Sequence, residues 1–159
     1  MKYFDSIAEN LKILQNKNDF RSFLQKNNDC TSGQVISIRD ADPSPASVSK
    51  FCSGRETEGK NKWTMGIMFH GTHYDSVGPI CRDGFKGGYF TSSFDYAKNR
   101  SQYKQRVTKS KEQDGHVLAM AVLVPEAYRH ELGHTDKQVP CPESHYAIPL
   151  FLVTVRDNN

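Results

Sequence analysis

The chain has 159 residues, a length that fits one domain with a single hydrophobic core. Charged residues make up 25% of it and the formal net charge is +3, which permits an anionic ligand or partner without requiring one. No apolar run approaches the roughly 18 residues that span a bilayer, so no membrane segment is expected.

The N-terminus lacks the apolar region of a signal peptide, and the four cysteines are scattered without a Cys-x-x-Cys pair. These features favour reduced thiols in an intracellular protein, cytoplasmic or nuclear. The protein is also expected to be a monomer. Two disulfides, and secretion as a toxin without a recognisable signal, remain open alternatives. The cysteines are Cys30, Cys52, Cys81 and Cys141.

The predicted organisation is one domain, with an N-terminal helical segment at residues 1–30 followed by a sheet core at residues 33–159. Apolar residues recur at helical spacing over 4–16, and a second helix is expected from the Asn18-Asp19 cap. Residues 34–39 alternate like a strand.

A proline-containing break at 42–45 precedes a predicted short helix, and 53–62 is interpreted as a solvated loop. The run 116–124 is apolar on both faces, which predicts a central strand covered twice. The other predicted strands are 64–70, 87–91 and 145–155, and the other predicted helices are 46–51, 73–83 and 94–104. The fold class is therefore α+β, with five to seven strands in a bent sheet and helices on its outer faces.

Two short motifs carry most of the chemical information. His70-Gly71-Thr72 ends one apolar strand, and Gly88-Tyr89-Phe90 opens another after Gly84-Phe85. A residue without a side chain lets a ligand approach the backbone closely. This arrangement suits a site that holds a small planar amide by backbone contacts.

The ordered motifs resemble the NAD-binding core of the diphtheria-toxin-like, poly(ADP-ribose)-polymerase-type ADP-ribosyltransferases. The similarity runs from about Val35 to Val155 and is specific over 64–124. It implies an ADP-ribosyltransferase-like fold, a bent and split antiparallel sheet with peripheral helices, and NAD as the substrate. It also implies that residues 126–144 form a loop between two late strands. Because the chain is small and lacks the full polymerase-type pattern, mono-ADP-ribosylation of a protein or nucleic-acid acceptor is expected.

The resemblance also assigns roles to individual residues. His70 matches the histidine that hydrogen-bonds the adenine-side ribose, Gly71 the glycine that pairs with the nicotinamide carboxamide, and Tyr89 the aromatic residue on the nicotinamide ribose. The family's second tyrosine is replaced by Asn99, and its carboxamide-binding serine by Tyr96. The expected NAD-binding residues are His70, Gly71, Thr72, Tyr89, Ser92, Ser93, Tyr96 and Ala97.

The family's reaction also uses a carboxylate that stabilises the positive charge developing on the ribose. Glu143 is the preferred candidate for this position, with His145 as the alternative. The expected catalytic residues are therefore Glu143, His70 and Tyr89.

Residues His130, Glu131 and His134 satisfy His-Glu-x-x-His and suggest a zinc peptidase as an alternative function. Pro125 and Gly133 argue against the long helix that this motif requires. A third possibility is a non-catalytic module that binds NAD, ADP-ribose or nucleic acid on the same fold.

The stretch 98–111 is rich in lysine and arginine and contains no acidic residue. Such a stretch can attract a nucleic-acid backbone or the cofactor diphosphate. The alternative is an ordinary solvated helix end and loop. Its basic residues are Lys98, Arg100, Lys104, Arg106, Lys109 and Lys111.

Overall fold

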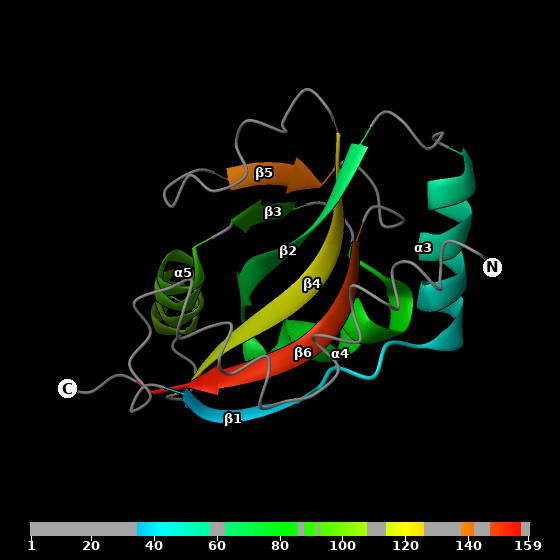
Figure 1. Ribbon diagram of the computed structural model, residues 1–159. Helices are drawn as coiled ribbons and strands as arrows, with labels where there is room; N and C mark the ends of the chain where they lie inside the picture. Colours follow the sequence, from blue (N-terminus) through cyan, green and yellow to red (C-terminus); the bar gives the residue numbers. More distant parts are fainter. Residues whose placement is uncertain are drawn as a thin grey trace.

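The computed structural model describes residues 35–57, 63–85, 88–91, 93–107, 114–125, 138–141 and 147–156. These residues form an α+β fold around a six-stranded antiparallel sheet with the order β1-β6-β4-β2-β3-β5 (Figure 1). The elements are β1 (Val35–Asp40), α3 (Pro45–Thr57), β2 (Trp63–Thr72), α4 (Tyr74–Asp83), β3 (Gly88–Thr91), α5 (Phe94–Val107), β4 (Gly115–Pro125), β5 (Gln138–Cys141) and β6 (Ala147–Val155). The α+β class is confirmed, and the helices predicted before residue 34 lie outside the described residues.

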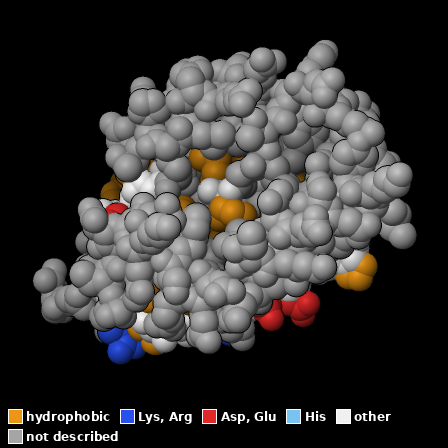
Figure 2. Space-filling view, in the orientation of Figure 1, with side chains coloured by type: hydrophobic (Ala, Val, Ile, Leu, Met, Phe, Trp, Pro, Cys, Tyr) orange, Lys and Arg blue, Asp and Glu red, His pale blue; other side chains and the backbone are white. Residues whose placement is uncertain are grey.

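Strand β4 is central, as its two-sided apolar pattern predicts. It pairs with β2 on one side and β6 on the other. Val117 and Ala119 pack in one core cluster with Phe94 and Ala97 of α5. The alternate residues pack in a second cluster, which Val77 and Ile80 of α4 join; from β4 these are Leu118, Met120 and Val122. The two helices therefore cover opposite faces of the sheet. Figure 2 shows apolar side chains at the centre of the view.

Helix α3 is longer than the sequence predicts. Ser44 caps its start, because the Ser44 hydroxyl accepts the backbone N–H of Ser47 at 3.1 Å and Pro45 occupies the first helical position. The helix continues to Thr57, so the loop predicted over 53–62 is wrong for its first five residues. The polar residues there do not interrupt a helix, since arginine and glutamate are good helix formers.

The predicted loop at 126–144 is also wrong in part, because β5 lies within it. β5 pairs antiparallel with β3 from Gly88–Cys141 to Thr91–Gln138. The strand contains Pro140, which lacks a backbone N–H and is therefore tolerated at a sheet edge. β5 occupies such an edge, and its four residues are too few to show a periodic pattern.

No helix in the described parts of the chain is long and apolar enough to cross a membrane.

Candidate active site

The two strands that carry the motifs separate from each other where the motifs begin. Phe69 and Thr91 are the one aligned pair between the described residues of β2 and β3. Continuing that antiparallel register would set Gly71 opposite Tyr89, but the ladder does not extend that far. A cavity of about 560 Å³ opens along both strands from this point. Its volume lies within the range usual for small-molecule sites.

His70 spans the gap between the diverging strands. Its Nδ1 lies 2.9 Å from the backbone oxygen of Tyr89, and its ring meets Phe85 edge-on with the centroids 4.5 Å apart. Because a carbonyl oxygen can only accept, Nδ1 carries the proton in this hydrogen bond. In the neutral ring Nε2 is then the acceptor, a suitable partner for a ligand hydroxyl.

The electrostatic surroundings keep His70 neutral. Burial lowers the pKa of His70 most, and the positive charge of Lys104 lowers it further, against the opposing effect of the Tyr89 hydrogen bond. The resulting pKa is about 4, compared with the ordinary 6.5. At neutral pH the imidazole therefore acts as a fixed, uncharged hydrogen-bonding group.

Gly71 is required by the packing of α5 on β2. A Cβ atom at this position would lie 1.8 Å from the backbone oxygen of Ala97, and Ala97 is itself buried. No side chain fits between the strand and the helix backbone. The absence of a side chain at Gly71 therefore lets α5 form one wall of the cavity directly beside the end of β2.

Two serines fix the position of α5. Ser93 caps the helix, since its hydroxyl accepts the backbone N–H of Tyr96 at 3.1 Å. Ser101 is fully buried, and its hydroxyl donates to the Thr72 carbonyl and accepts the His116 backbone N–H, each at 2.7 Å. One hydroxyl thus joins α5 to the ends of β2 and β4.

Helix α4 forms the opposite wall and begins directly after the first motif. The Nδ1 atom of His73 accepts the backbone N–H of Asp75 at 3.1 Å and so caps the first turn. The helix ends at Gly84, which has φ 96°, a conformation that glycine adopts without strain. Phe85 follows, and its ring supports His70.

The two basic residues that line the cavity belong to the basic stretch at 98–111, which the sequence indicates can attract a cofactor diphosphate, although neither is among the expected NAD-binding residues. Arg100 and Lys104 are among the lining residues together with Tyr96. The three are spaced at i, i+4 and i+8 on α5, which places them on one helix face, and this spacing was the available signal. Asn99, which takes the place of the family's second tyrosine, is exposed and does not line the cavity.

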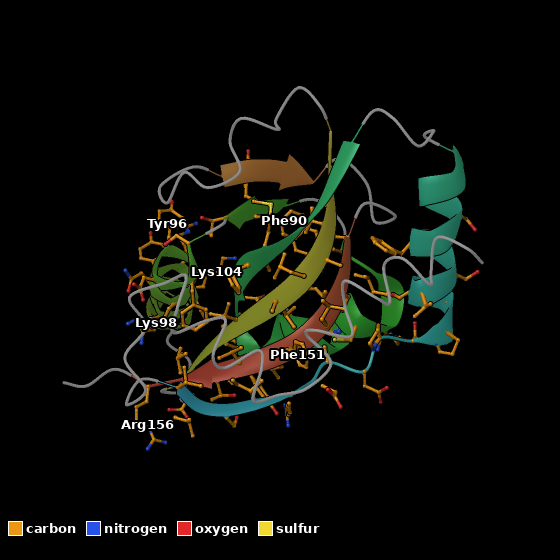
Figure 3. The ribbon with its side chains drawn as sticks, viewed as in Figure 1. Phe90, Tyr96, Lys98, Lys104, Phe151 and Arg156 are labelled. Carbon is orange, nitrogen blue, oxygen red and sulfur yellow. The ribbon has the colours of Figure 1, made fainter. Side chains whose placement is uncertain are left out.

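Lys104 contacts the first motif directly. Its Nζ donates to the backbone oxygen of Gly71 at 2.7 Å, and Figure 3 shows the side chain extending from α5 toward β2. The side chain is partly buried, and this burial together with the nearby charge of Arg100 lowers the pKa of Lys104. The ammonium group therefore lies where the resemblance expects the carboxamide.

Most predicted NAD-binding residues that the structure describes line this cavity. Ser93 does not, because it caps α5, while Ser92 lies outside the described residues. Tyr89 is 57% exposed, so its ring is available to a ligand. The predicted residues that line the cavity are His70, Gly71, Thr72, Tyr89, Tyr96 and Ala97.

The remaining candidates lie outside the described residues: Glu143, His145, and the motif residues His130, Glu131 and His134. Within the described ranges no group of three or more histidine, cysteine or acidic residues could hold a metal ion. Cys81, at the end of α4, is a free thiol.

No model of a known protein family matches the chain, and no curated protein sequence matches it.

Proposed function

We propose that this protein is an NAD-dependent ADP-ribosyltransferase that cleaves the nicotinamide–ribose bond and transfers a single ADP-ribose unit to a macromolecular acceptor. The observation that supports it best is the convergence of the two motifs and α5 on one cavity. Residues His70, Gly71 and Tyr89, which the resemblance assigns to NAD, are separated by up to 19 positions in the chain and line the same space.

The sheet geometry supports the proposal as well. A split antiparallel sheet is the family's arrangement, and here β2 and β3 share one aligned pair before they diverge around the cavity. The backbone at Gly71 borders this gap. A planar carboxamide bound there would make contacts of the kind that hold an added strand.

The proposed binding mode assigns a role to each motif. The Nε2 atom of neutral His70 would accept a ribose hydroxyl, since Nδ1 is committed to the Tyr89 carbonyl. The Gly71 carbonyl already accepts Lys104, but a carbonyl oxygen has two lone pairs and can accept a carboxamide N–H also. The exposed ring of Tyr89 would pack on the nicotinamide ribose.

Bond cleavage needs stabilisation of a cationic ribose. We propose Glu143 for this role, with His145 as the alternative. Glu143 follows Cys141 by two positions in the sequence, and Cys141 pairs with Gly88 of the cavity lining. Losing a group that stabilises transition-state charge typically lowers the rate about 10²–10³-fold.

The test is release of free nicotinamide from NAD by the purified protein, with acceptor pools of protein, DNA and RNA supplied separately. Glu143→Gln should reduce release about 100-fold or more while binding of NAD is retained. His145→Gln is the matched variant, because a larger loss there would transfer the role to His145. If the wild-type protein releases no nicotinamide above the rate without enzyme in any pool, the proposed activity is wrong.

A further inference from the structure

The two helical walls of the cavity carry opposite charge. Arg100 and Lys104 line it from α5, while Asp75 and Asp83 line it from α4. The Asp83 carboxylate is engaged by the Arg82 guanidinium at 2.9 Å, which reduces its negative field. Asp75 is highly exposed and lies near His73. The α5 wall is therefore the side of the cavity that attracts an anion.

Lys104 is the strongest cation on that wall because of where its ammonium lies. The side chain is partly buried, and the Gly71 carbonyl fixes the nitrogen at 2.7 Å. Withdrawal from water strengthens the attraction of this charge for an anion in the cavity. The ammonium also influences the first motif, since its charge contributes to the lowered pKa of His70.

Arg100 adds a second positive charge one helical turn away. Its charge is one of the causes that lower the pKa of Lys104, so the two cations repel each other. Arg100 is exposed and its guanidinium lies 5.3 Å from the ring centre of Tyr103. An oxyanion placed between the two side chains would relieve this repulsion and accept charge-assisted hydrogen bonds from both.

We propose that Arg100 and Lys104 form an oxyanion subsite on the α5 wall beside Gly71, which selects a dinucleotide by a phosphate or carboxylate group. This inference rests on the proposed function for the class of ligand. It also predicts how the site discriminates, because the nicotinamide ring of NAD is itself cationic and gains nothing from a neighbouring ammonium. The negative group is either the diphosphate or the carboxylate of nicotinic acid adenine dinucleotide.

Calorimetric titration with four probes separates these sources: NAD, ADP-ribose, nicotinic acid adenine dinucleotide and inorganic pyrophosphate. The variants are Lys104→Met and Arg100→Gln, with Arg39→Gln as the control that removes an exposed charge outside the cavity. Arg100 is exposed, so its variant tests the subsite even if Lys104→Met destabilises the fold.

If the diphosphate occupies the subsite, each cavity variant should weaken all four probes about tenfold or more, while Arg39→Gln changes them less than about twofold. If the carboxylate occupies it, nicotinic acid adenine dinucleotide alone should bind more tightly than NAD and lose that advantage in both variants. Unchanged affinity for every probe in both variants would overturn the subsite, as would failure of the wild-type protein to bind any probe.

The two proposals fail in different ways. If pyrophosphate binding depends on Lys104 but no nicotinamide is released from NAD, the proposed function is wrong and the proposed subsite still stands. If nicotinamide is released, but the wild type and both variants bind the four probes with equal Kd values, the proposed subsite is wrong and the proposed activity still stands.

Discussion

Strand β2 has two very different neighbours. Along β4 it is aligned over ten residue pairs from Trp63–Pro125 to Thr72–His116, and residues 115–122 of β4 are buried. Along β3 it is aligned at Phe69–Thr91, and a cavity follows. The paired strands β2 and β4, called the seam below, should therefore contribute most to the stability of the fold. The gap between β2 and β3 instead leaves backbone and side-chain groups available to bind a ligand.

This contrast explains why polar residues in the same strand differ in role. Thr72 is buried and its carbonyl is held by Ser101, so it belongs to the seam. His70 lies across the gap, and a single side-chain hydrogen bond to Tyr89 replaces the missing ladder there. Changes at the seam should unfold the protein, and changes at the gap should alter what it binds.

Gly71→Ala should have the largest effect, because Gly71 belongs to both regions. The added Cβ would lie 1.8 Å from the Ala97 carbonyl, so α5 must move, and overpacking of this kind costs about 3 kcal/mol. Urea unfolding measures the loss. Gly78→Ala is the control, since nothing lies within 4 Å of that Cβ. Its gain in helix propensity is offset because Pro79 disfavours helical backbone at the preceding residue, so the unfolding free energy should change by less than about 1 kcal/mol. Equal stability of the two variants would contradict the packing.

The pH dependence of stability should report His70. Its folded pKa of about 4 lies below the ordinary 6.5, so between these values the unfolded chain binds a proton that the folded protein does not. The contribution is fully present above pH 6.5 and is lost as the pH falls toward 4, by about 3 kcal/mol in total. Between pH 4 and 6.5 the unfolding free energy should change less steeply with pH in His70→Gln than in the wild type. An unchanged slope would show that His70 is not the group responsible.

Ser101→Ala tests the seam with a smaller change. It removes both hydrogen bonds of the hydroxyl and leaves the buried His116 N–H without that acceptor, which should lower the unfolding free energy by about 1–3 kcal/mol. Asn99→Ala on the same helix is exposed and should change it by less than about 0.5 kcal/mol. Similar values for the two variants would mean that Ser101 does not join α5 to the strands.

Tyr89→Ala should have the smallest effect on stability and a clear effect at the gap. The side chain is 57% exposed, so unfolding free energy should change by less than about 0.5 kcal/mol. Loss of its stacking surface should weaken binding of NAD about fivefold to tenfold. Tyr74→Ala, which is 48% exposed and does not line the cavity, is the matched control. Equal binding by both variants would remove Tyr89 from the site.

Several elements could be predicted because their signal is local. The central position of β4 follows from its two-sided apolar run, and α4 begins within one residue of its predicted start. The C-terminal end of α3 and the existence of β5 could not be predicted. A polar segment can continue a helix, and a four-residue strand containing Pro140 depends on β3 as its partner.

The sequence by itself determined the α+β class, the central strand and the two glycine-containing motifs, because side-chain periodicity and the absence of a Cβ act over a few neighbouring residues. Only the tertiary structure decided that β2 and β3 separate, that His70 spans the gap, and that Arg100 and Lys104 face Gly71. These relations depend on the packing of α5 against β2, which brings together residues about 30 positions apart in the chain.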